Sequence, residues 1–155
     1  MTTRPLAKRL RDAYERFLEG NPEALVAMLA DDVVYELSGR HLGGGVLRGK
    51  TVVLERIAAA AQWCEPPPKI VVVEVVSAGA LVVSLERFVA ECRGARVDQH
   101  AAVVWRFAPD GRCVEMSTCF EDQEAVDRFW EPFTPDRRGA LPRARARAAS
   151  PRARR

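Results

Sequence analysis

The chain has 155 residues and a formal net charge of +3, with 48% hydrophobic and 29% charged residues. This length predicts one domain, two at most, with a hydrophobic core that needs neither disulfides nor a structural metal. Glu74 and Glu86 interrupt the longest apolar run, so no segment reaches the roughly 20 apolar residues of a membrane-spanning helix. The charged N-terminal segment lacks a signal-peptide pattern. We therefore expect a cytoplasmic protein with no membrane partner.

The positive charge comes from the C-terminal end. Residues 137–155 contain eight arginines and no acidic residue, whereas residues 1–136 carry a net charge of −5. Because this Arg/Ala/Pro-rich segment has almost nothing to bury, we expect a disordered tail over 134–155, after a domain over 1–133. A basic tail can bind anions, but a charge run without aromatic residues does not favour nucleic acid binding over a solvated extension.

The first half of the chain has helical periodicity, with breaks at glycine and proline. In chain order, we expect a helix over 5–18, a second over 22–29, a short strand over 33–37, a glycine-rich loop over 39–49 and a third helix over 50–64. Three consecutive prolines, 66–68, then end this helical region.

The second half changes to period two and is rich in β-branched residues. We expect strands over 69–77, 80–92, 95–108 and 112–120, separated by turn-type clusters, and then a helix capped by Asp122. Connections this short make an antiparallel meander. The order α-α-β-α-β-β-β-β-α predicts an α+β fold in which a curved antiparallel sheet wraps around the N-terminal helices and forms a conical pocket.

No cofactor or metal motif fits this element order. Residues 44–51, GGVLRGKT, match the phosphate-binding pattern GxxxxGK[ST], but that loop needs a parallel strand before it and crossover connections after it. The four cysteines form no CxxC pair and have no histidine at zinc spacing. We interpret the loop match as accidental and the cysteines as free thiols, and we expect neither a cofactor nor a metal.

The segments ALVAMLADDVVYELSG, LRGKTVVLERI and VVWRFAPDGRCVEMSTCFEDQEAVDRFW resemble the nuclear transport factor 2-like superfamily. Within it, the chain is similar to SnoaL-like and ketosteroid-isomerase-like proteins over about residues 5–131. The resemblance implies a cone-shaped α+β fold. It does not imply one activity, because members include isomerases, cyclases, epoxide hydrolases, dehydratases and non-catalytic binding proteins.

Comparison with ketosteroid isomerase places Tyr14 where that family has its oxyanion-binding tyrosine. The position of the catalytic base, however, is Leu37, and that of the acid donor is Val103. The resemblance therefore supplies one hydroxyl and no carboxylate.

Comparison with limonene epoxide hydrolase matches Tyr35 and Arg87 to that family's tyrosine and arginine. The asparagine position is again Leu37, and the two aspartate positions are Val89 and Thr118. No general acid or base follows from either relative.

Strand alternation supplies a list of pocket residues if Arg87 points inward. The expected ligand-binding residues are mostly apolar or aromatic: Leu37, Trp63, Val89, Gln99, Val103, Trp105, Met116 and Phe120. Such a lining is typical of a small-molecule site.

The expected catalytic residues are Arg87, Tyr35, Tyr14, His41 and Thr118. Arg87 and a tyrosine hydroxyl would stabilise oxyanion charge, while His41, or a water held by Tyr35 and Thr118, would move the proton. Each residue also has a structural interpretation: the tyrosines as core residues, Thr118 as a strand former and His41 as a solvated loop residue. Arg87 could equally form an ion pair with Glu74 or Glu91.

These observations favour a cofactor-independent SnoaL-like enzyme acting on a hydrophobic, carbonyl-rich small molecule. Polyketide-type cyclisation, isomerisation, dehydration or hydrolysis in secondary metabolism, as in antibiotic biosynthesis, would fit. The alternative is a non-catalytic binding protein with the same pocket. The outer sheet face, with His100, Ala102 and Val104, predicts an isologous homodimer.

Overall fold

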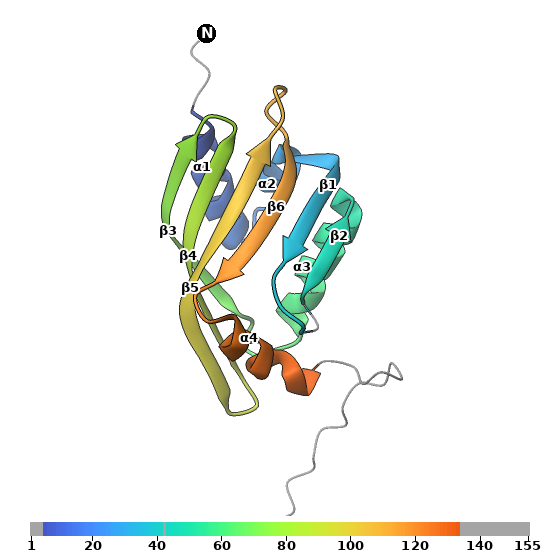
Figure 1. Ribbon diagram of the computed structural model, residues 1–155, viewed down its shortest axis with the longest axis vertical. Helices are drawn as coiled ribbons and strands as arrows, with labels where there is room; N and C mark the ends of the chain where they lie inside the picture. Colours follow the sequence, from blue (N-terminus) through green and yellow to red (C-terminus); the bar gives the residue numbers. More distant parts are fainter. Residues whose placement is uncertain (1–4, 42, 134–155) are drawn as a thin grey trace, which may run out of the picture.

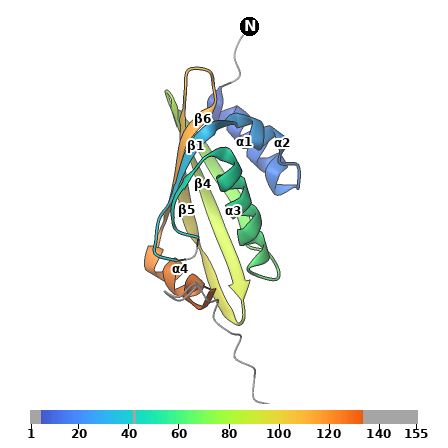
Figure 2. The same cartoon turned by 90° about the vertical axis from the view of Figure 1, so that its right-hand side faces the viewer.

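The computed structural model describes residues 5–41 and 43–133. Its elements are α1 (Leu6–Leu18), α2 (Glu23–Met28), β1 (Leu29–Leu37), β2 (Gly45–Arg48), α3 (Lys50–Gln62), β3 (Lys69–Ala78), β4 (Leu81–Cys92), β5 (Ala95–Phe107), β6 (Cys113–Phe120), α4 (Gln123–Trp130) and a 3₁₀ turn (Glu131–Phe133). One six-stranded sheet has the order β2-β1-β6-β5-β4-β3. Helices α1, α2 and α3 lie on one face of this curved sheet, and α4 lies at its end (Figure 1 and Figure 2).

Strands β3 to β6 form the expected antiparallel meander. The β4–β5 hairpin turns through Arg93 and Gly94, both at positive φ, and pairs Cys92 with Ala95. This turn geometry matches the right-handed twist of the strands. The connection therefore fixes the register along the whole hairpin, up to Leu81 opposite Arg106.

The first strand departs from the expected antiparallel sheet. β1 runs parallel to β6, so the sheet is mixed. A further strand, β2, forms inside the expected glycine-rich loop and pairs antiparallel with β1 at the sheet edge. The two expectations were wrong for different reasons: pairing of β1 with the last strand is a long-range contact, whereas four residues among glycines carry too little local periodicity to indicate a strand.

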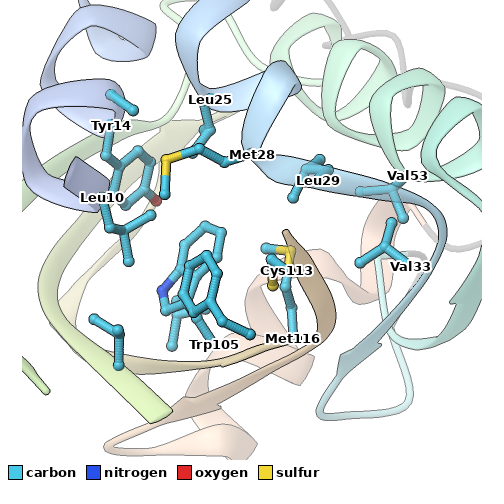
Figure 3. Packing of buried hydrophobic residues seen from close by; sticks show 14 of the residues in the cluster. Leu10, Tyr14, Leu25, Met28, Leu29, Val33, Val53, Trp105, Cys113 and Met116 are labelled. Atoms are coloured by element: carbon cyan, nitrogen blue, oxygen red, sulfur yellow. The ribbon is translucent and has the colours of Figure 1, made fainter. Parts of the chain in front are cut away.

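The interior lies between the helices and the concave face of the sheet. α1 contributes Leu10 and Tyr14, α3 contributes Val53, and the sheet contributes Val82 and Trp105 (Figure 3). Leu10, Val53 and Val82 are fully buried. Truncating a large apolar residue at such a position typically costs about 2–5 kcal/mol, so this cluster holds the three helices on the sheet.

A second cluster lies where α4 crosses the end of the sheet. The Asp122 side chain accepts a hydrogen bond from the Ala125 amide at 2.9 Å, which confirms the predicted cap. Val126, Phe129 and Trp130 of α4 are buried against strand residues. No helix in the described ranges is long and apolar enough to cross a membrane. The predicted tail over 134–155 lies outside the described residues.

Candidate functional site

A cavity of about 100 Å³ lies between the helices and the inner face of the sheet, with an opening to solvent. Its walls come from α1, α2, β1, α3, β3, β5 and β6: Tyr14, Phe17, Leu25, Val26, Leu29, Tyr35, Leu54, Ile57, Ile70, Val103, Trp105 and Met116. Apart from the two tyrosine hydroxyls and the Trp105 indole N–H, this lining is apolar. The cavity therefore suits an uncharged, largely hydrophobic ligand.

Tyr14 links the cavity to the polar groups behind it. Its ring packs edge-to-face on Trp105, with ring centroids 5.8 Å apart and an interplanar angle of 70°. In Figure 3 the two side chains face each other across the interior, one from α1 and the other from β5. The Tyr14 hydroxyl donates a hydrogen bond to Glu86 Oε2 at 3.0 Å. Burial, followed by the nearby Glu86, raises the pKa of Tyr14 above its ordinary value, so the phenol stays protonated.

Glu86 is a buried carboxyl group that the sequence analysis did not single out. Glu86 lies on β4 and is only 4% exposed to solvent. Its Oε1 accepts a hydrogen bond from Ser84 Oγ at 2.8 Å, and Ser84 Oγ accepts one from Trp105 Nε1 at 3.0 Å. Burial raises the pKa of Glu86 to about 7, while the hydrogen bonds from Ser84 and Tyr14 act in the opposite direction.

Tyr35 and Thr118 form a second polar pair beside the first. A hydrogen bond of 2.7 Å joins the Tyr35 hydroxyl to Thr118 Oγ1. The pair arises because parallel strands β1 and β6 bring these residues to the same face. Burial raises the pKa of Tyr35 to about 12, so this hydroxyl is also neutral. The cavity thus offers neutral hydroxyl groups that can hydrogen-bond a ligand oxygen.

Three of the eight expected ligand-binding residues, Val103, Trp105 and Met116, line the cavity. Among the others, Leu37 packs at the margin of the main core, while Trp63 and Phe120 pack on the second cluster. Gln99 is buried on the inner face, where its side chain exchanges two hydrogen bonds with the backbone of Asp122. It positions the start of α4.

The predicted inward orientation of Arg87 and Val89 was wrong. The Arg87 side chain is 53% exposed on the outer face, where its guanidinium donates two hydrogen bonds, of 2.7 and 2.8 Å, to Asp98. Its partner is thus neither Glu74 nor Glu91. The inner face carries Glu86 instead, and the difference has a physical basis. A buried carboxyl group can become neutral near pH 7, whereas a guanidinium remains charged.

The sequence contains a signal that could have identified Glu86. Arg93-Gly94 predicts a two-residue hairpin turn, which pairs Cys92 with Ala95 and therefore Glu86 with Ala101. Residues directly opposite each other on antiparallel strands share a face. Ala101, Val103 and Trp105 are alternate residues of one strand and therefore share a face. If that face points toward the interior, the Glu86 side chain points toward the interior too.

His41 lies outside the cavity lining, against Trp130 of the second cluster. Its Nδ1 accepts a hydrogen bond from the Gly43 amide at 3.0 Å, its Nε2 lies 3.9 Å from Asp127 Oδ1, and its ring stacks on Trp130. Burial lowers the pKa of His41, against the effect of Asp127. His41 thus packs the loop after β1 against α4. Its side chain is buried, so the interpretation of His41 as a solvated loop residue was wrong.

Within the described part of the chain, no group of three or more His, Cys, Asp or Glu residues is placed to hold a metal ion. The cysteines are free thiols as predicted, with Cys64, Cys92 and Cys113 buried and Cys119 exposed.

Three helices packed in the concave face of a curved mixed sheet, with an apolar cavity between them, define a nuclear transport factor 2-like α+β protein. The SnoaL-like domain pattern matches residues 10–116, and the chain belongs to this family.

Solved structures share this fold. Bal32a, from a soil-derived mobile gene cassette, is 24% identical, with a TM-score of 0.74 over 81% of this chain and 95% of its own. TerC, co-crystallised with polyporic acid, is 19% identical, with a TM-score of 0.69 over 83% and 99% of the two chains. A putative SnoaL-like polyketide cyclase from Jannaschia sp. CCS1 is 16% identical, with a TM-score of 0.64 over 84% and 96%. No curated protein matches the chain.

Proposed function

We propose that the protein is a cofactor-independent, cytoplasmic enzyme acting on a hydrophobic small molecule that carries a carbonyl group. The supporting observation is the apolar cavity, where the Tyr14 hydroxyl meets a buried carboxyl group and the Tyr35 hydroxyl meets Thr118. Hydroxyl donors in a dry site stabilise negative charge that develops on a carbonyl oxygen. Isomerisation, cyclisation, dehydration or hydrolysis of a polyketide-type intermediate in secondary metabolism is the proposed chemistry.

The polyketide cyclase and TerC structures support this proposal by likeness of fold, since one is a putative SnoaL-like polyketide cyclase and the other was co-crystallised with a small molecule, polyporic acid. At sequence identities of 16% and 19%, these two structures indicate a shared fold and not a shared activity. The apolar cavity of this chain supports the substrate class.

A ligand-binding assay with a matched pair of compounds tests the proposal. Cyclohexanone and methylcyclohexane have similar size, but only the ketone can accept a hydrogen bond. Because one neutral hydrogen bond contributes about 0.5–1.5 kcal/mol, we expect the ketone to bind about 2- to 12-fold more tightly. Leu54→Phe, which fills the cavity from α3, should abolish binding of both compounds. Failure of both to bind the wild-type protein would refute the proposal.

A non-catalytic binding protein is the second candidate. It is favoured by the absence of any carboxylate among the lining residues, since Glu86 reaches the cavity through Tyr14. Nuclear magnetic resonance of the bound ketone in D₂O separates the candidates. An enzyme that forms an enol or enolate exchanges the hydrogens beside the carbonyl faster than buffer does, whereas a binding protein returns the ketone unchanged.

We also propose that the outer sheet face forms an isologous homodimer. No described helix covers this face (Figure 2), and it exposes Val71, Val76 and Leu85 by 43–56%. Ala102 lies opposite Leu85 and extends the apolar surface toward the predicted residues Val104 and His100. Light scattering should give the mass of a dimer, and Leu85→Lys should give a monomer. A wild-type monomer at every concentration would refute the dimer.

A further inference from the structure

The hydrogen-bond chain behind the cavity has a fixed direction. The indole N–H of Trp105 can only donate, so Ser84 Oγ accepts from it at 3.0 Å. The single hydroxyl hydrogen of Ser84 then points at Glu86 Oε1, 2.8 Å away. Oε1 is therefore held as an acceptor, and a proton that binds to Glu86 goes to Oε2.

The partner of Oε2 is the Tyr14 hydroxyl, 3.0 Å away. When Glu86 is ionised, Tyr14 donates its hydrogen to Oε2, and the phenol oxygen can offer the cavity only lone pairs. When Oε2 is protonated, the carboxyl group donates to the Tyr14 oxygen instead, because two hydrogens cannot share one contact. The Tyr14 hydrogen is then released, and Tyr14 is a lining residue of the cavity.

The surroundings of Glu86 make this protonation accessible near neutral pH. The ion pairs among the described residues do not include Glu86, and the titratable groups acting on it from other elements are Tyr14 on α1 and Tyr35 on β1. Both tyrosines are neutral. Neither α1 nor β1 therefore supplies a positive charge that would keep the buried carboxyl group ionised. A buried carboxyl group without a cation favours its neutral form.

We propose that Glu86 sets the hydrogen-bonding polarity of the cavity: when neutral it makes Tyr14 a donor toward the ligand, and when ionised it makes Tyr14 an acceptor. This inference rests on the proposed function and narrows the ligand to a neutral carbonyl compound whose oxygen meets Tyr14. An engineered cavity of about 150 Å³ holds benzene, so this cavity of about 100 Å³ accommodates at most one small ring, and the rest of a larger ligand would lie in the opening to solvent.

The test measures the affinity of cyclohexanone and methylcyclohexane between pH 5 and 9. If the neutral form of Glu86 binds the ketone, the ketone affinity is constant below about pH 6 and falls by up to tenfold per pH unit above the pKa, until binding without the hydrogen bond remains. The hydrocarbon affinity should not change. Glu86→Gln should give a pH-independent ketone affinity, because its amide NH₂ donates to Tyr14 while its carbonyl accepts from Ser84. Glu36→Gln, at an exposed position of β1, is the matched control and should keep the wild-type profile.

A second measurement needs no variant. Calorimetry of ketone binding at pH 8, in buffers of different ionisation enthalpy, should report an uptake of about 0.1 to 0.5 proton per ligand, because a 2- to 12-fold affinity ratio raises the pKa of Glu86 by at most about one unit. A pH-independent ketone affinity in the wild type, a profile that survives in Glu86→Gln, or binding at pH 8 without proton uptake would each overturn the inference and leave the proposed function standing. Failure of both compounds to bind at any pH overturns the proposed function, and the inference with it.

Discussion

The two ends of the sheet's inner face differ in how they fill their interior. Around Trp105, the strands and helices leave a cavity bordered by tyrosine residues, one of which is hydrogen-bonded to a buried carboxyl group behind it. Around Trp130, the rings of Trp63, Phe129 and Phe133 each pack edge-to-face on that tryptophan, and Phe129 packs at a tilt on Phe133. β4 and β5 contribute to both ends.

The cavity end buries Glu86 and the other end buries His41, with different consequences. His41, whose side chain is 4% exposed, accepts a hydrogen bond from a loop amide and stacks on Trp130, while its Nε2 lies 3.9 Å from Asp127 and has no hydrogen-bond partner among the described residues. Glu86 contacts hydroxyl groups, one of which faces open space. Burial of a titratable residue does not by itself indicate a site. Unfilled volume beside it does.

The largest effect is expected at the filled end. Trp130→Ala should lower the free energy of unfolding by about 3–5 kcal/mol, because it removes a buried indole that three aromatic rings contact. Denaturant unfolding measures the loss, and ketone affinity of the folded protein should stay at the wild-type value, since the cavity lining shares no residue with this cluster. A parallel loss of affinity would show that the two ends are coupled.

The two buried titratable groups should give stability profiles of opposite sign. Glu86 has a folded-state pKa of about 7, raised from 4.5 chiefly by burial, so the folded state holds a proton that the unfolded chain loses as pH rises between these values. Its contribution to stability is present below about pH 4.5 and is lost by about pH 7, a decrease of roughly 3 kcal/mol at about 1.4 kcal/mol per unit.

The pKa of His41 is lowered from 6.5, chiefly by burial, so its contribution is present above about pH 6.5 and is lost as pH falls. Unfolding measured from pH 4 to 8 in Glu86→Gln and His41→Gln isolates each term. Glu86→Gln should remove the loss at rising pH, and His41→Gln the loss at falling pH. If the stability contributions of Glu86 and His41 changed with pH in the same direction, the expected difference between the two ends would be wrong.

Enlarging a side chain should have unequal costs at the two ends. Ala90→Leu inserts atoms into the filled cluster and should destabilise the protein by about 1–3 kcal/mol. Leu54→Phe extends into the cavity and should change stability by less than about 1.5 kcal/mol while it abolishes ketone binding. Thermal melts and calorimetry on the two variants provide the measurement. Equal destabilisation would mean that the cavity end is as closely packed as the other.

The smallest effect is expected outside both ends. Arg87→Met removes an exposed ion pair with Asp98, and such pairs are screened by solvent and salt. We expect ketone affinity to remain unchanged and the melting temperature to shift only slightly, less so at high salt. A large loss of ketone affinity would show that Arg87 contributes to the ligand site, although its side chain lies on the outer face.

Local patterns predicted most of the fold. Helical spacing identified α1 and α3, period two and turn residues identified β3 to β6, and Asp122 identified the start of α4. The pairing of β1 with β6 was missed because it joins segments far apart in the sequence, and the short strand β2 was missed because four residues among glycines carry too little periodicity.

The candidate site was predicted in part. Tyr14, Tyr35, Val103, Trp105 and Met116 were expected in the pocket and line it. The orientation of β4 was assigned from Arg87, although the two-residue turn at Arg93-Gly94 is incompatible with placing both Arg87 and Gln99 inward. Because β4 and β5 are neighbouring strands joined by a two-residue turn, the sequence alone determines their register.

The sequence by itself determined the type and order of nearly all elements, because hydrophobic periodicity and turn chemistry act over a few residues. Only the tertiary structure decided which buried polar groups meet. Tyr14 and Glu86 are 72 residues apart, and Tyr35 and Thr118 are 83 apart. The curvature of the sheet and the packing of three helices bring these pairs together, and the same packing leaves the space that makes one end of the interior a cavity and the other a solid core.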